Sequence, residues 1–177
     1  MIADHDAPVE TMWAGQYLIA KRRGRWEYVA RARGVRAAVI VAIDEGHILL
    51  VDQYRVALGR RCLELPAGLV GDEAEGEATD VAAARELEEE TGYRARRIED
   101  CGEFFSSPGM VSESFTLVRA HDLTRTGDGG GVDDEDIAVH RVPLADVAAF
   151  VAARRAEGLA VDVKLLLLLG AGIVGSG

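Results

Sequence analysis

The segment ARELEEETGY, residues 84–93, constrains the fold of this chain more than any other stretch. Its residues favour a helix from roughly Glu77 to Thr91, and Gly92 stands where a helix commonly ends. Within that segment, four glutamates fall in five positions, at 86, 88, 89 and 90. This placement is unfavourable, because the C-terminal end of a helix carries partial negative charge. Glutamates three or four positions apart also repel one another, by about 0.2–0.5 kcal/mol per pair.

Helix geometry separates the four glutamates into two groups. At about 100° per residue, Glu86, Glu89 and Glu90 fall on one face, whereas Glu88 points away from them. A neighbouring apolar stripe suits packing on a sheet and consists of Ala83, Ala84 and Leu87. Two interpretations of the carboxylate face are open. It is either a metal site, whose oxygen ligands suit Mg²⁺ or Mn²⁺, or an acidic surface solvated by water.

Composition limits the classes of protein to consider. The 177 residues are 49% hydrophobic, which is enough for one domain with a core, and the net charge of −10 argues against a general nucleic-acid binder. Cys62 and Cys101 form no CxxC pair, so no disulfide framework or zinc site is expected and a reducing cytoplasm is the simplest compartment. The N-terminus lacks a signal-peptide pattern. The segment KLLLLLGAGIV is too short to span a membrane and is expected to be a buried helix.

Charge is distributed unevenly along the chain. Residues 71–93 hold nine acidic side chains against Arg85 alone, and residues 21–36 hold seven basic ones against Glu27. An acidic pole and a basic segment in one small domain suit a metal site that faces an anionic ligand. Two solvated surfaces of opposite sign would give the same pattern.

The pattern of apolar residues predicts a mixed α+β protein. A second helix is expected over residues 143–158, and the glycine-rich residues 125–136 are expected to form a mobile loop. Residues 65–78 and 107–113 also have loop composition. The absence of a regular βαβ alternation favours a sandwich built on a mixed sheet. The predicted strands are 16–20, 25–31, 37–43, 47–55, 96–105, 114–121 and 136–142.

Residues 71–93 resemble the Nudix box, G-x5-E-x7-R-E-U-x-E-E-x-G-U, where U is apolar. Leu87 fits the first apolar position and Tyr93 is an acceptable occupant of the last. The positions that match by identity are Gly71, Glu77, Arg85, Glu86, Glu89, Glu90 and Gly92. This agreement identifies the chain as a member of the Nudix hydrolase superfamily and favours the metal-site interpretation.

The flanking segments resemble the ADP-ribose and ADP-sugar pyrophosphatases of that superfamily. LELPAG at residues 63–68 is similar to the segment that precedes their box, and SPGMVSE at 107–113 to their downstream loop. Pro108 lies sixteen residues after Gly92, a spacing associated with the ADP-ribose subgroup. GRWEYVAR and VDQYR also resemble that subgroup.

The resemblance implies an α/β/α sandwich with a mixed sheet and an N-terminal antiparallel β arm. Residues 1–35 would form the arm, used for dimerisation and substrate binding, and residues 36–177 the hydrolase domain. The implied reaction is Mg²⁺-dependent hydrolysis of ADP-ribose to AMP and ribose 5-phosphate, with Mn²⁺ able to substitute. The alternatives are another ADP-sugar, GDP-mannose or an oxidised nucleoside diphosphate as substrate, or a non-catalytic nucleotide sensor. No membrane or nucleic-acid partner is expected.

The resemblance also implies roles for residues around the metal. Glu86 and Glu90 would be the main ligands, helped by Glu89 and by the backbone carbonyl of Ala67. The catalytic residues implied are Glu113, Glu89 and Arg85. Arg85 would pair with Glu77 and orient the helix, and Glu113 would be the general base. Two alternatives are open here: Glu113 as an ordinary loop glutamate, and Glu64 as either part of the metal site or a support for its loop.

Substrate recognition is implied for the basic and aromatic N-terminal part. Trp26 would stack on adenine, and Arg31 and Arg55 would contact the diphosphate. Pro108 would also belong to the substrate-binding residues. Trp13 would either form the other side of the adenine clamp or serve as a core or dimer contact. The arm commonly builds a homodimer in this subgroup, so a dimer is expected.

Overall fold

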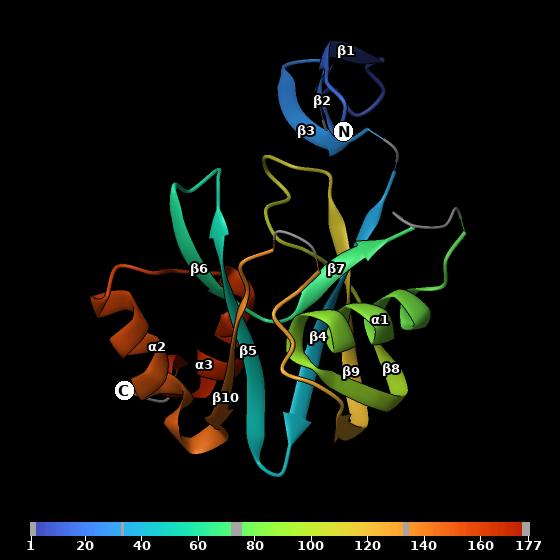
Figure 1. The fold of residues 1–177 in the computed structure, drawn as a ribbon. Coiled ribbons are helices and arrows are strands. Elements are labelled where there is room, and N and C mark those ends of the chain that lie inside the picture. Colours follow the sequence, from blue (N-terminus) through green and yellow to red (C-terminus); the bar gives the residue numbers. More distant parts are fainter. Residues whose placement is uncertain (1–2, 33, 72–75, 133–134, 175–177) are drawn as a thin grey trace.

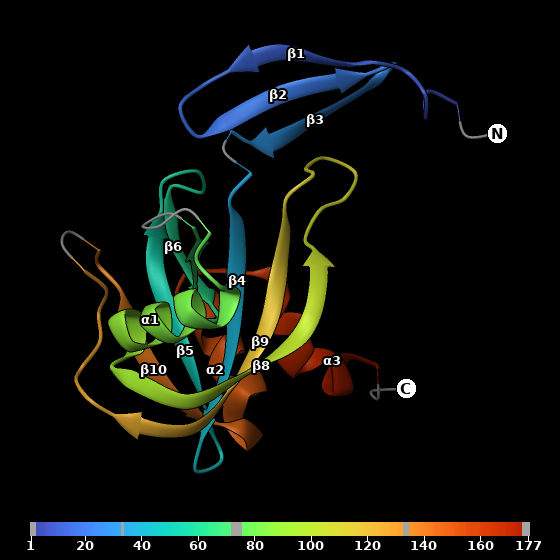
Figure 2. The same cartoon turned by 90° about the vertical axis from the view of Figure 1, so that its right-hand side faces the viewer.

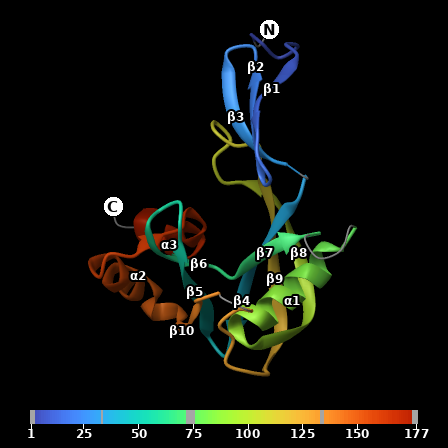
Figure 3. The ribbon, with the colours of Figure 1, turned by 45° about the horizontal axis from the view of Figure 1, so that its top comes forward.

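A computed structural model describes residues 3–32, 34–71, 76–132 and 135–174. Within these ranges the first strands form a separate three-stranded antiparallel sheet in the order β1-β2-β3. Figure 3 shows this arm projecting from the rest of the molecule. The expectation of an N-terminal antiparallel arm is confirmed. The strands are β1 (Val9–Ala14), β2 (Leu18–Arg23) and β3 (Trp26–Arg31).

The larger sheet is mixed, with the order β11-β6-β5-β4-β9-β8 and with β10 paired to β5 and β7 paired to β4. Strands β4 and β9 run parallel, as do β6 and β11, while the other pairs are antiparallel. The bounds are β4 (Arg36–Asp44), β5 (His47–Arg55), β6 (Arg60–Glu64), β7 (Ala67–Val70), β8 (Tyr93–Phe105), β9 (Ser114–Arg125), β10 (Ala138–Pro143) and β11 (Ala160–Val161).

Helices cover both faces of this sheet. Helix α1 lies on one side, and α2 and α3 lie on the other (Figures 1 and 2). This confirms the predicted α/β/α sandwich. None of the helices in the described ranges is long and apolar enough to cross a membrane. The helices are α1 (Thr79–Thr91), α2 (Val147–Ala156) and α3 (Leu166–Val174), with 3-10 turns η1 (Leu144–Asp146) and η2 (Val163–Leu165).

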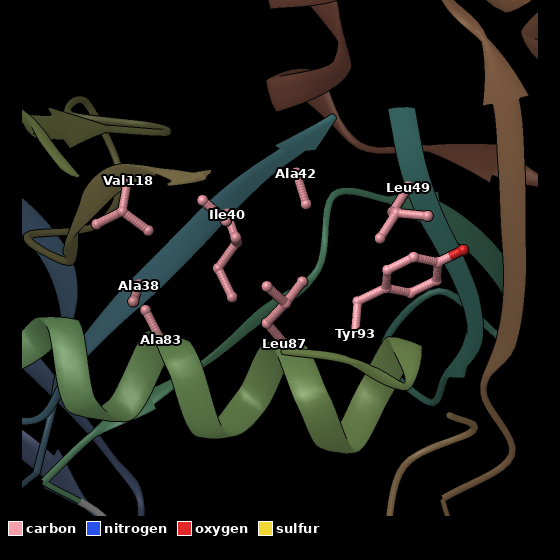
Figure 4. Close-up of a cluster of buried hydrophobic side chains, with 9 residues drawn as sticks. Ala38, Ile40, Ala42, Leu49, Ala83, Leu87, Tyr93 and Val118 are labelled. Carbon is pink, nitrogen blue, oxygen red and sulfur yellow. The ribbon is translucent and has the colours of Figure 1, made fainter. Parts of the chain in front are cut away.

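Each helical layer has its own core. The apolar stripe of α1 packs on the central strands, where Ala83 and Leu87 lie against Ala38 and Ile40 (Figure 4). All four side chains are fully buried. On the other face, α2 and η2 bury Val147, Val151 and Leu165 against β5 and β6. Two residues of the predicted apolar stripe, Ala83 and Leu87, therefore fix α1 on the sheet, whereas Ala84 is only partly buried. The opposite side of the helix stays available for polar contacts.

The structure corrects two of the sequence expectations. Residues Ala67–Val70 form β7 inside a segment expected to be a loop, because their backbone pairs with the first half of β4. The C-terminal helix exists but is not buried: none of its described residues is fully buried, and Leu167 is 58% exposed.

A buried charge cluster joins three strands of the sheet. Asp52 on β5 accepts hydrogen bonds from Arg61 on β6 and from His140 on β10, the latter at 2.5 Å. Arg61 also binds the carboxylate of Asp136 at 2.6 Å. Burial raises the pKa of Asp52, but the hydrogen bonds from His140 and Arg61 outweigh it and hold that pKa below its usual value.

Replacing Asp52 should destabilise the fold in a pH-dependent way. We expect Asp52→Asn to lower the free energy of unfolding by about 1–3 kcal/mol at neutral pH, because Arg61 loses its buried partner. The folded-state pKa is depressed, so the stabilisation is present above the unfolded value of 3.8 and is lost as pH falls through and below it. Urea unfolding at pH 7 and at pH 2.5 measures this. Asp6→Asn, at an 84% exposed side chain, is the control, and an equal loss in Asp52→Asn at both pH values would contradict the assignment.

Candidate active site

A pocket of about 340 Å³ opens between the end of the arm, β7 and the loop before β9. Several predicted site residues line it, namely Arg31, Arg55, Glu64, Ala67 and Glu113. They come from β3, β5, β6, β7 and the 107–113 loop, so the fold gathers side chains that are far apart in the sequence. Gly68, Ser106, Phe115 and Lys164 are among the other lining residues.

Two arginine–carboxylate pairs cross this pocket. Arg31 Nε donates to Glu113 Oε1 at 2.7 Å. Arg55 makes a bidentate contact with Glu64, from Nε at 2.6 Å and from Nη2 at 2.7 Å. The Glu64 side chain is 7% exposed, whereas that of Arg55 is 43% exposed. Both arginines thus present cationic donors to a solvent-filled pocket while a carboxylate holds each in place.

Glu90 is the most deeply placed of the helix carboxylates. Its residue is only 4% exposed, and its Oε2 accepts a hydrogen bond from the Ala67 backbone N–H at 3.0 Å. Burial raises the pKa of Glu90 to about 8, the Ala67 hydrogen bond opposes that rise, and the charges of Glu86 and Glu135 add to it. The negative form of Glu90 is therefore disfavoured here unless a cation lies nearby.

Glu86 lies against β7, in a position that depends on Gly68. A Cβ atom added to Gly68 would fall 1.9 Å from Cδ of Glu86, so a larger residue there would displace this carboxylate from its present position. Burial raises the pKa of Glu86, an effect that Arg85 opposes and Glu89 reinforces. Two of the three proposed ligands on this face are thus held beside one short strand.

Arg85 lies among the carboxylates of the helix. Its guanidinium is 3.1 Å from both Glu86 and Glu89, and 3.6 Å from Glu77. The expected ion pair with Glu77 is present, and Glu77 also accepts a hydrogen bond from the Gly71 backbone at 3.2 Å. Glu88 points elsewhere and pairs with Arg94 on β8, as its helical position predicts.

The carboxylates on the acidic face of α1 have the oxygen donor atoms that a hard divalent cation prefers. Among the described residues no three acidic, histidine or cysteine side chains stand close enough together to hold a metal ion. The donors on this face are nevertheless oxygen atoms only, Glu90 is buried with a raised pKa, and Gly68 leaves a recess for Glu86. Oxygen donors of this kind suit Mg²⁺ or Mn²⁺.

A second pocket, of about 320 Å³, lies beside the arm and contains Trp26 and Pro108. Phe105 and Val111 also line it. Trp26 is 58% exposed, so its ring is available for stacking. Trp13 is elsewhere: it is 61% exposed on β1, with its ring over Gly15. Within one chain the structure brings Trp26 and Pro108 together and leaves Trp13 apart from them.

The arm and the 107–113 loop are joined through backbone atoms. Val29 N–H donates to the Met110 carbonyl at 3.0 Å, and Ser112 N–H donates to the Val29 carbonyl at 2.9 Å. This short bridge lies between Trp26 and Arg31 on the arm and between Pro108 and Glu113 on the loop. It therefore sets the aromatic pocket and the arginine-lined pocket side by side.

Two residues near the site were missed from the sequence. Lys164 lines the first pocket, where its Nζ is 2.7 Å from Asp162 and lies over the Phe115 ring. Glu135 influences the pKa of both Glu86 and Glu90 through its charge. Both come from segments that contain no motif. No local pattern could have found them, because tertiary folding alone brings them to the site.

The NUDIX domain family matches residues 32–161, which is most of the chain and includes the acidic helix, the Arg55–Glu64 pair and Glu113, while Arg31 lies just before the match. The chain therefore belongs to the NUDIX domain family, and the sequence-based assignment is confirmed. The described geometry agrees with this, since α1 carries the Arg85–Glu90 part of the box beside β7, whose Ala67 and Gly68 line the first pocket.

The chain is similar in sequence to two named bacterial pyrophosphatases. The chain is 37% identical to an ADP-ribose pyrophosphatase of Bacillus subtilis over 118 residues, 66% of this chain and 62% of that protein. It is 35% identical to a GDP-mannose pyrophosphatase of Cronobacter sakazakii over 146 residues, 77% of this chain and 72% of that protein. The chain thus spans less than two thirds of the Bacillus subtilis relative.

A solved structure shares the fold over almost the whole chain. The crystal structure of an ADP compounds hydrolase superposes with a TM-score of 0.69 and 25% sequence identity, covering 96% of this chain and 94% of that one. The coverage extends over the N-terminal arm as well as the sandwich.

Proposed function

We propose that this protein hydrolyses the diphosphate of ADP-ribose to AMP and ribose 5-phosphate with the help of Mg²⁺. The observation that carries the proposal is the placement of the acidic helix against β7, because Ala67 and Gly68 of that strand line the pocket with the two arginines. The aromatic pocket lies beside the arm. Anionic phosphates suit the arginine-lined pocket, and a flat nucleobase suits the aromatic pocket. The named activities of the Bacillus subtilis relative and of the structural neighbour support the same substrate class.

Substrate binding would use both pockets. Arg31 and Arg55 would contact the diphosphate, for which a planar guanidinium offers paired donors. Trp26, beside Pro108, would stack on adenine, a contact worth about 1–3 kcal/mol by analogy with base stacking elsewhere. Trp13 remains a candidate second wall of the adenine clamp only if it comes from another copy of the chain, since it lies away from Trp26 within its own.

The metal would be held by the acidic face of α1. Glu86, Glu89, Glu90 and the backbone carbonyl of Ala67 are the proposed ligands for Mg²⁺, and Mn²⁺ can substitute. When bound, such an ion neutralises charge on the diphosphate and makes water more acidic. Arg85, held between Glu77 and the other carboxylates, orients the helix that carries them.

Hydrolysis also needs a proton acceptor. Water attacks one phosphorus, a new P–O bond forms, the bridging P–O bond breaks, and the departing phosphate keeps the electron pair. We assign the water proton to the carboxylate of Glu113, which lines the pocket. Glu113 is held by its hydrogen bond to Arg31, and Glu135 is a second candidate because its charge acts on both Glu86 and Glu90.

Four glutamine substitutions separate these roles. We expect Glu90→Gln to lower kcat/KM for ADP-ribose by about 100-fold or more, because a buried ligand to the cation is lost. Removing the true general base should lower kcat by about 10²–10⁴-fold, so Glu113→Gln and Glu135→Gln identify it. Glu88→Gln is the control, since Glu88 is on the same helix but pairs with Arg94. Wild-type rates in Glu90→Gln would refute the metal role.

The substrate is tested by product analysis in ¹⁸O-labelled water with Mg²⁺. We expect AMP and ribose 5-phosphate, and the position of the label reports which phosphorus is attacked. A panel of ADP-ribose, other ADP-sugars, GDP-mannose and oxidised nucleoside diphosphates should show the highest kcat/KM for ADP-ribose. A preference for GDP-mannose, which the Cronobacter sakazakii relative makes the main competitor, would overturn the adenine assignment. Binding of ADP-ribose without release of AMP would indicate a sensor.

The arm also supports a homodimer. Its three strands bury little of their own surface, and the exposed apolar side chains include Met12, Trp13 and Tyr17, each more than half exposed. Apolar area of this kind on a small sheet is typical of an interface.

Both cysteines are free thiols, which agrees with a reducing compartment such as the cytoplasm.

Light scattering coupled to size-exclusion chromatography tests the dimer. At micromolar concentration we expect a mass of about twice the 19.0 kDa of one chain. A Tyr17→Arg substitution on the arm should shift the mass towards one chain, because a charge is then placed in the apolar contact. A wild-type mass of one chain would contradict the proposal.

A further inference from the structure

The end of α1 is closed by a loop that lies more than thirty residues further along the chain. We call residues 126–131 the glycine clamp. The last carbonyl groups of a helix have no hydrogen-bond donor inside the helix. Here backbone N–H groups of the clamp are those donors. The contacts are Gly131 N–H to the Glu89 carbonyl at 3.0 Å, Gly130 N–H to the Glu90 carbonyl at 2.9 Å, and Thr126 N–H to the Gly92 carbonyl at 2.7 Å.

The close approach of clamp and helix requires glycine on both sides. Gly129 has φ +68, and an added Cβ would fall 2.5 Å from the Glu90 carbonyl oxygen and 2.4 Å from the carbonyl carbon of Thr91. On the helix side, a Cβ on Gly92 would fall 2.4 Å from the Gly127 carbonyl oxygen. These neighbours are backbone atoms, so they cannot turn aside as a side chain would.

The far end of the loop is also held. Arg61, which binds the buried Asp52, contacts the carboxylate and the carbonyl of Asp136. Near the clamp, Glu135 Oε2 accepts a hydrogen bond from Val132 N–H at 3.2 Å. The segment expected from its sequence to be mobile is therefore attached to α1 at one end and to the sheet at the other.

The clamp acts on the part of α1 that local forces favour least. The last turn of a helix frays first, and here it carries repelling carboxylates at the negative end of the helix dipole. Glu89 and Glu90 offer their carbonyls to the clamp and their side chains to the acidic face. Fixing those two carbonyls fixes the Cα atoms from which the carboxylates extend.

We propose that the glycine clamp is a positioning element for the carboxylates of Glu89 and Glu90, and that Gly129 sets how tightly the chain binds a divalent cation. The inference rests on the proposed function, because it takes these carboxylates to be cation ligands. Gly129 touches neither substrate nor metal in this scheme. It acts through the backbone of Glu90. Displacing the end of the helix therefore weakens cation binding more than it disturbs the rest of the pocket.

Titration of the full chain with Mn²⁺ alone, followed by electron paramagnetic resonance of the free ion, tests the proposal. We expect Gly129→Ala to bind Mn²⁺ at least about tenfold more weakly than wild type, the size of effect known for groups that orient metal ligands. Gly46→Ala is the matched control: Gly46 has φ +77, and an added Cβ would meet nothing within 4 Å. It carries similar backbone strain without the collision and should keep wild-type affinity.

The outcomes separate this inference from the proposed function. Wild-type Mn²⁺ affinity in folded Gly129→Ala overturns the clamp and leaves the hydrolase proposal standing. Failure of the wild-type chain to bind Mn²⁺ overturns both. Retained binding in Gly46→Ala together with a loss in Gly129→Ala supports the clamp, because general strain at a positive φ is then excluded as the cause.

Amide hydrogen exchange of the wild-type chain gives a readout that needs no variant. If cation binding and the clamp are coupled, each must stabilise the other. Saturating Mg²⁺ should then slow exchange at Gly130 and Gly131 by at least about tenfold more than at Leu49 in the core of β5. Equal slowing at all three amides would reflect only global stabilisation and would overturn the proposal.

Discussion

Burial of the Glu90 carboxylate behind β7 is the constraint around which this molecule is arranged. A carboxylate that is 4% exposed must have hydrogen-bond partners or a nearby cation, because a bare buried charge is too costly to retain. The Ala67 backbone N–H provides one partner, which requires β7 to lie alongside α1. The apolar side of α1 then fixes the helix on the sheet, so that Leu87 and Glu90 are buried for opposite reasons. One side of α1 thus stabilises the fold by packing on the sheet, and the other side carries the proposed metal ligands.

The sequence predicted the features whose causes are local. The acidic helix, the burial of Ala83 and Leu87 and the direction of Glu88 away from the other glutamates follow from helical periodicity, and the structure contains all three. The box and its flanking motifs identified the family, which the comparison confirms. Strand β7 was missed because its composition is that of a loop and its strand character comes from pairing with β4. Lys164 and Glu135 were missed because only tertiary folding brings them near the pocket and the carboxylates.

The pairing of Arg31 with Glu113 could not have been read from the sequence either. These residues are 82 positions apart, and the motifs presented them as independent candidates for phosphate binding and proton transfer. Their contact means that each constrains the other: the guanidinium fixes the orientation of the carboxylate, and the carboxylate competes with any other anion for the guanidinium. A role that a motif suggests for one of these residues therefore depends also on the residue with which it pairs in the folded chain.

The bridge between the arm and the 107–113 loop has a consequence for how such a protein can change over evolutionary time. Val29 is joined to Met110 and Ser112 through main-chain atoms, and such bonds form with almost any side chain at these positions. The side chains of the aromatic pocket can therefore change while the joint, and with it the placement of Arg31 and Glu113, stays the same. A fold with such a backbone joint can alter the shape and polarity of one pocket without disturbing the neighbouring one.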